Sequence, residues 1–175
     1  MMDLRPTRRD MLTTALGAGA FFLLPDIARA QAADTGALGP PEVFSFERLR
    51  EMALALSGKP HAPEPIPQAG IVDQIDYDRH NQIAFRKDRA LWNTSGASPV
   101  QFFFPGKYFP EPVHFYTVTD GMARAVRFNT DYFDIPEGNP ARQLTGTTGF
   151  AGFRVQDEPG GDDWMAFLGA SYWRT

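Results

Sequence analysis

The chain has 175 residues, a formal net charge of −4 and no cysteine. The acidic balance and the lack of any lysine- or arginine-rich run argue against nucleic acid and anionic membrane surfaces as partners. Without cysteine no disulfide can stabilise the fold, so a core of apolar side chains has to do so. A hydrophobic content of 43% over this length allows one conventional core.

The first thirty residues have the pattern of a bacterial export signal. Arg8 and Arg9 precede an apolar run, Leu12–Leu24, that is shorter than the ~20 residues a membrane-spanning helix needs. Ala28 and Ala30 form a small-x-small end, which predicts cleavage after Ala30. The paired arginines favour the twin-arginine export machinery as a partner, with an ordinary secretory signal as the alternative. This interpretation places the mature protein in the periplasm without a stable membrane anchor.

A flexible lead-in and one helix are expected next. Residues 31–43 are small, polar and Pro/Gly-bearing, which is typical of a flexible segment. Ser45 can cap a helix, and apolar residues recur at helical spacing from Phe46 to Leu56. Gly58 and Pro60 then end the helix. We expect an amphipathic helix that packs against a larger body.

The remainder of the chain has β character. Val113–Val118 and Ala123–Phe128 flank Asp120-Gly121, a pair that favours a tight hairpin because both residues tolerate positive φ. Further strands are expected at residues 83–86, 100–104, 150–155 and 164–168. This pattern predicts a mainly β fold, an antiparallel sandwich with one N-terminal amphipathic helix. Residues 44–175 offer fewer strands than a sandwich needs, so we interpret them as an incomplete N-terminal sandwich domain.

Recognised catalytic and metal-binding patterns receive little support. His61, His80 and His114 lie far apart with no carboxylate at ligand spacing, so neither a metal ligand nor a cofactor is expected. No G-x-S-x-G motif and no glycine-rich phosphate loop occurs. Aspartates 73, 76, 78, 162 and 163 cluster in turn-like surroundings, where such side chains usually bond the backbone, although carboxylate pairs can also cleave sugars. We predict no catalytic residue in this chain.

Aromatic side chains are the more informative candidates. They make up 13% of the chain, and most are expected in the core. Flat rings with a polar handle also suit the faces of neutral pyranose rings, and an arginine can bond the hydroxyls. The candidates for such glucan contacts are Trp92, Tyr108, Tyr172, Trp173 and Arg174. The last three stand in a row, so they cannot all point inward along a strand.

Several motifs in order resemble those of a known family. They are Ile75-Asp76-Tyr77-Asp78, Ile83-Ala84-Phe85-Arg86 followed by Ala90-Leu91-Trp92, Val100–Gly106, Gly149–Arg154 and Phe167–Arg174. From Phe44 to its end the chain resembles the periplasmic glucan biosynthesis proteins of the MdoG/OpgG/OpgD type. The twin-arginine leader is more similar to the OpgD branch.

The resemblance implies a fold and a function. The family has a large N-terminal β-sandwich of the galactose-mutarotase-like kind and a smaller immunoglobulin-like C-terminal domain, and we expect the latter to lie outside residues 1–175. Its members act on or bind the β-1,2-linked backbone of osmoregulated periplasmic glucans, and some resemble inverting endo-β-1,2-glucanases. The family's catalytic acid lies downstream of Thr175, so residues 1–175 alone are expected to be inactive. The alternative is a non-enzymatic carbohydrate-binding or scaffold protein of the periplasm.

Overall fold

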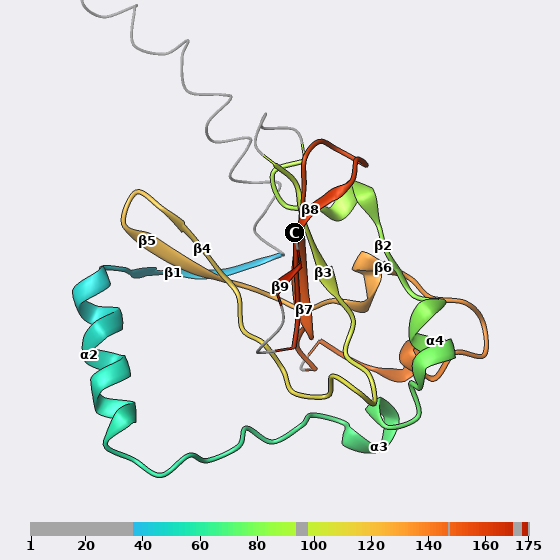
Figure 1. Ribbon diagram of the computed structural model, residues 1–175, viewed down its shortest axis with the longest axis horizontal. Helices are drawn as coiled ribbons and strands as arrows, with labels where there is room; N and C mark the ends of the chain where they lie inside the picture. The colour runs from blue at the N-terminus through green and yellow to red at the C-terminus, as the bar shows by residue number, and fades with distance from the viewer. Residues whose placement is uncertain (1–36, 94–97, 147, 170–172, 175) are drawn as a thin grey trace, which may run out of the picture. The chain divides into compact units, whose positions relative to one another are not determined.

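The computed structural model describes residues 37–93, 98–146, 148–169 and 173–174 (Figure 1). The predicted signal peptide, with Arg8, Arg9 and the cleavage site after Ala30, lies outside these residues. Within them, no helix combines the length and the apolar character needed to cross a bilayer. In chain order the helices and strands are β1 (Leu38–Val43), α2 (Phe46–Ser57), α3 (Ala69–Val72), α4 (Tyr77–Asn81), β2 (Ala84–Phe85), β3 (Val100–Phe103), β4 (Tyr116–Thr119), β5 (Met122–Val126), β6 (Phe133–Asp134), β7 (Gly152–Gln156), β8 (Asp163–Leu168) and β9 (Trp173–Arg174). Short 3₁₀-helices lie at Lys87–Arg89, Thr130–Tyr132 and Pro140–Gln143.

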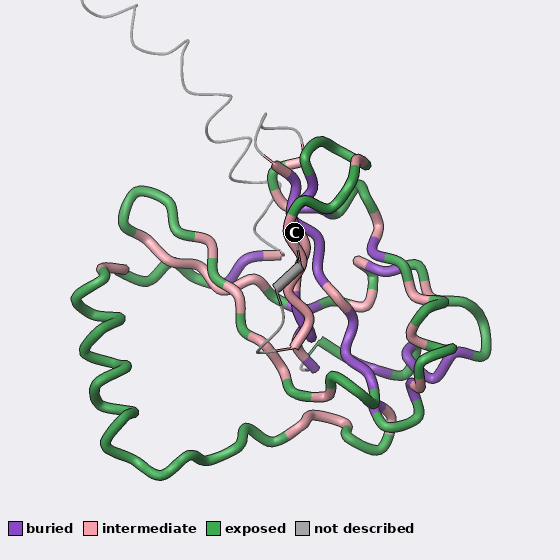
Figure 2. Tube along the Cα trace, in the orientation of Figure 1, coloured by how far each residue is buried: buried purple, intermediate pink, exposed green. Residues whose placement is uncertain are grey.

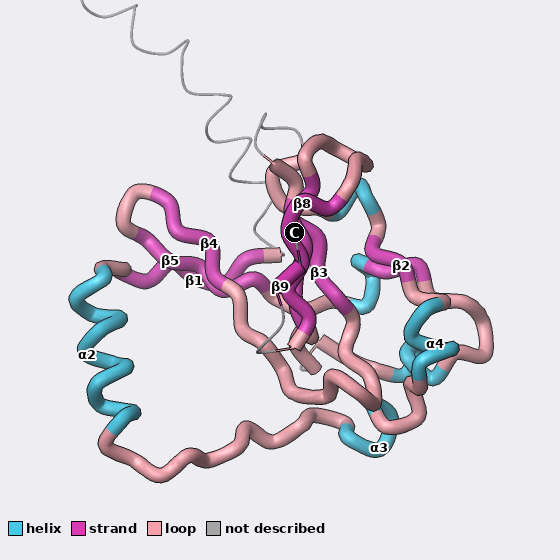
Figure 3. Tube along the Cα trace, viewed as in Figure 1, coloured by secondary structure: helices cyan, strands magenta, loops and turns pink. Residues whose placement is uncertain are grey.

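The strands of the described chain pair antiparallel throughout, in the orders β1-β5-β4, β2-β6 and β3-β7-β8-β9. Figure 3 shows β3, β8 and β9 in the middle of the described part, the β4–β5 hairpin projecting to one side, and helices α2, α3 and α4 toward the margins. The prediction of a mainly β, antiparallel fold is confirmed. Each strand expected from the sequence is present, with ends shifted by a few residues.

The β4–β5 hairpin forms as its sequence predicts. Asp120 and Gly121 occupy the turn with φ of 51° and 73°. Thr119 pairs with Met122 across it. Two central residues with positive φ give the turn a twist that matches the right-handed twist of the flanking strands. The local residues therefore define this connection.

The lead-in expected over residues 31–43 differs from the structure, because Leu38–Val43 forms strand β1. Leu38 lies opposite Val126 and Val43 opposite Met122, with an irregularity between Leu38 and Pro41. A proline cannot donate to a ladder, but β1 lies at the edge of its sheet, where one side needs no donors. The prediction of flexibility is therefore wrong for residues 38–43, while residues 31–36 lie outside the described part.

Helix α2 begins where the sequence predicts, but its packing does not follow the expectation. Ser45 Oγ accepts a hydrogen bond from the Arg48 backbone N–H at 3.1 Å, which satisfies a donor of the first turn. No residue of the helix is buried. Phe46 remains 77% exposed and Leu56 64%. Figure 2 shows the helix exposed along its length. The expected packing against a larger body is therefore not found among the described residues.

Two short helices between α2 and β2, α3 and α4, were not expected. They have four and five residues, too few for a helical period to show in the sequence. The Asp76 side chain caps α4 by accepting from the Arg79 backbone N–H at 3.0 Å. Further along the chain, Asp163 pairs with Arg154 at 3.4 Å. Asp76 thus has the backbone role that the sequence favoured over catalysis, whereas Asp163 forms an ion pair.

The core is built mainly from phenylalanine rings. Phe102, Phe104, Phe133 and Phe150 are each at most 6% exposed. The Phe102 and Phe150 rings stack with centroids 4.4 Å apart, and those of Phe104 and Phe133 meet edge to face at 4.9 Å. Such pairs add to the free energy gained by burying the rings. Fewer than half of the described aromatic side chains belong to this core, so the expectation that most of them are buried is wrong. The exposed aromatic side chains are Phe46, Tyr77, Trp92, Tyr108, Phe109, Tyr116 and Trp164.

A buried polar network connects strands β3 and β7. Gln101, only 1% exposed, donates to Gln156 Oε1 at 2.8 Å and accepts from Arg154 Nη2 at 2.6 Å. Gln156 in turn donates to the Gly161 carbonyl at 2.8 Å. Every buried side-chain polar atom of the described residues has a partner, so the network does not carry the cost of an unmade hydrogen bond.

Candidate functional site

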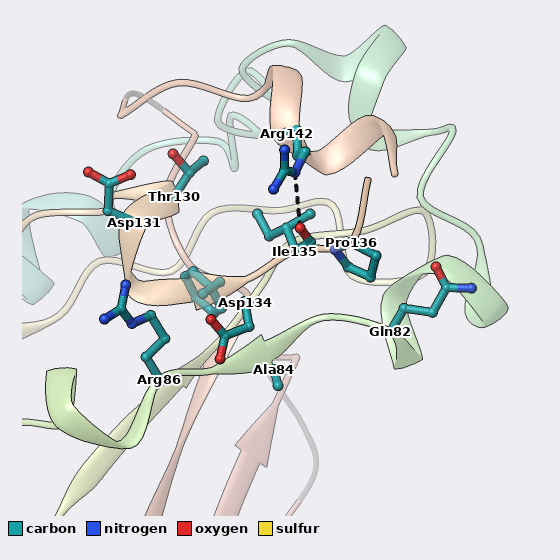
Figure 4. A pocket seen from close by; sticks show the side chains of 10 residues that line it. Gln82, Ala84, Arg86, Thr130, Asp131, Asp134, Ile135, Pro136 and Arg142 are labelled. Atoms are coloured by element: carbon teal, nitrogen blue, oxygen red, sulfur yellow. Dashed lines mark hydrogen bonds between the residues drawn. The ribbon is translucent and has the colours of Figure 1, made fainter. Parts of the chain in front are cut away.

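A pocket of about 660 Å³ opens beside the β2–β6 sheet (Figure 4). Its volume falls within the range of about 300–1,000 Å³ that is typical of small-molecule sites. The lining residues are Gln82, Ala84, Arg86, Thr130, Asp131, Phe133, Asp134, Ile135, Pro136 and Arg142. The pairing of Ala84 with Asp134 and of Phe85 with Phe133 brings the two segments of this wall together.

Both guanidinium groups of the pocket are held in place. Arg86 donates to both carboxylate oxygens of Asp88, from Nε at 3.3 Å and from Nη2 at 3.2 Å. This hydrogen bond is the largest cause that lowers the pKa of Asp88, so Asp88 is ionised and the pair is formed near neutral pH. Arg142 donates from Nε to the Ile135 carbonyl at 3.0 Å. An arginine has five N–H donors, so both side chains keep donors for a ligand.

Two carboxylates line the same pocket. Asp134 ends strand β6, and Asp131 lies in the first turn of the 3₁₀-helix that precedes it. Figure 4 shows Arg86 and Asp134 on the side of the β2 ribbon, and Thr130 and Arg142 across from them. Two carboxylates therefore balance two guanidiniums, and donors and acceptors both face the pocket. Such an arrangement suits hydroxyl groups, which donate and accept at once.

His80 and His114 make local polar contacts. His80 Nε2 lies 2.8 Å from the Phe104 carbonyl oxygen, and His114 Nε2 lies 2.9 Å from the Glu64 carboxylate. Among the residues with a described position, no three or more histidine, aspartate or glutamate side chains gather closely enough to hold a metal ion.

The residues predicted to contact glucan do not lie at the pocket. Trp92 is 48% exposed with φ of 60°, and Tyr108 is 63% exposed in a turn closed by the Phe109 N–H and the Gly106 carbonyl. Neither lines the pocket.

The C-terminal candidates are only partly within the described chain. Trp173 and Arg174 form β9, opposite Phe167 and Ala166. Tyr172 lies outside the described residues.

Sequence reasoning did not find the pocket. Of its charged residues only Arg86 stood in a motif that had been singled out, and nothing in the local pattern around Asp131, Asp134 or Arg142 marks a site. A usable signal would have been the charged residue that directly follows the buried phenylalanine of each strand, Arg86 after Phe85 and Asp134 after Phe133. That signal is common in surface strands, so it has meaning only once β2 and β6 are known to pair.

The fold and the site define a mainly β, antiparallel protein with a ligand-sized polar pocket. Residues 44–175 match the family described as "Periplasmic glucan biosynthesis protein, MdoG", and the chain belongs to this family.

Three curated relatives show the same affiliation. The chain is 39% identical to Glucans biosynthesis protein D 2 of Ralstonia nicotianae, over 97% of this chain and 33% of that protein. It is 35% identical to Glucans biosynthesis protein D of Xanthomonas campestris pv. campestris and to that of Stenotrophomonas maltophilia, in each case over 96% of this chain and 33% of the relative. The chain thus spans about a third of the length of these relatives, and the resemblance noted in its motifs is confirmed.

Proposed function

We propose that this protein takes part in periplasmic glucan biosynthesis and contacts the β-1,2-linked glucan backbone through exposed aromatic side chains. The family affiliation and the names of the relatives support the process. The exposed rings of Trp92 and Tyr108 support the mode of contact, since a flat apolar ring with a polar handle can cover a sugar face.

The conformation of Trp92 is the observation that carries the proposal. A bulky residue with φ of 60° is an outlier, and it persists only where the surrounding structure imposes it. The preceding Leu91 is anchored by reciprocal backbone hydrogen bonds with Val100, at 2.9 and 3.1 Å. The half-exposed indole of Trp92 therefore follows directly on a backbone segment that two hydrogen bonds hold in place. Strained residues of this kind cluster at ligand sites.

Replacing Trp92 with alanine tests the contact. We expect the affinity of the full-length gene product for linear β-1,2-glucan to fall about tenfold, since loss of one stacked ring costs ~1.4 kcal/mol. The measurement is isothermal titration calorimetry.

The matched control for this test is Trp164→Ala. Trp164 is 51% exposed in strand β8, lacks the positive φ of Trp92 and should leave the affinity unchanged. Unchanged binding by Trp92→Ala, or equal weakening by both variants, would refute the assigned contact. Trp173→Ala extends the same test to β9.

A purely binding or scaffolding role is the second candidate. It is favoured by the structural roles of the aspartates: Asp76 caps α4, and Asp163 pairs with Arg154. Incubating β-1,2-glucan with the full-length gene product and analysing the products separates binding from cleavage. We expect residues 1–175 alone to release no product in the same assay.

We further propose that export to the periplasm uses the twin-arginine machinery and leaves no stable membrane anchor. Changing Arg8 and Arg9 together to lysine should remove the protein from the periplasmic fraction and leave uncleaved precursor in the cytoplasm. Immunoblots of cell fractions measure this, and Arg5→Lys provides the control. Normal export of the double variant would instead indicate an ordinary secretory signal.

A further inference from the structure

We infer that the pocket beside β2 and β6 is a carbohydrate subsite for an uncharged glycosyl unit, separate from the aromatic contacts. The identity of the sugar, a glucose unit of a β-1,2-linked chain, rests on the proposed function. The existence of a polar ligand site rests on the geometry of the pocket itself.

The charges of the pocket select the class of ligand. A phosphate would find Arg86 and Arg142 but also the two carboxylates, and like charges brought together cost several kcal/mol. A cation would meet the two guanidiniums in the same way. A neutral polyhydroxyl ligand meets no such repulsion, because each hydroxyl can donate to Asp131 or Asp134 and accept from an arginine.

The two guanidinium groups of the pocket and the backbone of Asp134 have partners before a ligand arrives. Asp88 holds Arg86 through two hydrogen bonds, and the Ile135 carbonyl holds Arg142. Asp134 is fixed on the backbone by the pairing of β6 with β2. Side chains that are held in place lose little further freedom on binding, which lowers the cost of association.

The pocket also offers an apolar surface. The side chains of Ala84, Ile135 and Pro136 line it beside the charged groups. A pyranose ring has C–H groups on its faces and hydroxyls around its edge, so it can pack on such a surface while its hydroxyls reach the carboxylates. The lining is mainly polar, which suits a ligand that carries hydroxyl groups around its edge.

The test uses Asp134→Asn and, separately, Arg142→Gln in the full-length gene product, with short β-1,2-linked glucose oligomers as the probe. Each change removes the charge of one hydrogen-bonding partner, so we expect about a tenfold loss of affinity by calorimetry. Asp120→Asn is the matched control. It makes the same chemical change at the exposed tip of the β4–β5 hairpin, where asparagine tolerates the positive φ. Unfolding midpoints equal to that of the unaltered protein exclude misfolding, and Asp131→Asn replaces any pocket variant that fails this check.

The outcomes separate the subsite from the proposed function. Normal binding by both pocket variants, with binding lost in Trp92→Ala, overturns the subsite and leaves the proposed function standing. Loss in the pocket variants with normal binding by Trp92→Ala supports the subsite and overturns the aromatic contact. Binding of inorganic phosphate that depends on Arg142 overturns the neutral ligand in favour of an anion site. No binding of the oligomers by the unaltered protein overturns both.

Discussion

Replacing Gly152 with alanine will destabilise the sheet of β3, β7, β8 and β9 by about 3 kcal/mol or more. Gly152 begins β7 and lies opposite Phe103 on one side and Leu168 on the other. A Cβ at this position would overlap the Phe167 carbonyl oxygen and lie 3.0 Å from Leu168 Cα. These are backbone atoms of the neighbouring strand, so no side-chain rotation can relieve the overlap and the strand itself has to move.

Urea unfolding of the protein, followed by circular dichroism, measures the loss. Gly58→Ala is the control, because Gly58 has φ of −83° and no atom lies within 4 Å of an added Cβ. Its effect should stay within about 0.5 kcal/mol. Equal midpoints for the two variants would show that β7 and β8 separate more easily than their pairing implies.

Replacing Phe150 with alanine will cost about 3–5 kcal/mol. The side chain is 1% exposed. Its ring lies 4.4 Å from the Phe102 centroid and 5.2 Å from that of Phe128. The variant loses the transfer free energy of the ring and leaves a cavity, because rings that interlock from several segments cannot close fully around it.

The expected result depends on burial and not on the type of residue removed. Tyr77→Ala is therefore the control, since Tyr77 is 66% exposed at the start of α4 and should change the free energy of unfolding by no more than about 0.5 kcal/mol. Phe150→Leu, which keeps much of the volume, should cost less than Phe150→Ala. A loss below about 1 kcal/mol in Phe150→Ala would mean that the ring cluster is not the core of the folded protein.

Features decided by neighbouring residues could be predicted from the sequence. The Asp120-Gly121 turn needs only two residues that accept positive φ, and the chain supplies them. The start of α2 needs only a side-chain oxygen at Ser45, which accepts from the Arg48 N–H. Asp76 also caps α4 through a local hydrogen bond, although this five-residue helix was too short to be predicted. Each of these interactions spans three residues or fewer.

Features decided by distant partners could not be predicted. Leu38–Val43 contains two prolines, and its sequence predicts a flexible lead-in. It forms a strand because it pairs with β5. The periodicity of α2 predicts an apolar face but not what covers it, and in the described chain Phe46 and Leu56 stay exposed. Local pattern reports amphipathicity, whereas burial depends on where the rest of the chain lies.

The sequence by itself determined the mainly β class, the tight hairpin, the helix cap and the family, because motifs and local propensities carry that information. It also pointed to an export signal and to aromatic glucan contacts as predictions. Only the tertiary structure decided the pocket. Arg86 and Asp134 are far apart in the chain and line the same pocket because Phe85 pairs with Phe133 across β2 and β6. A site made by such long-range pairing has no spacing that a sequence could display.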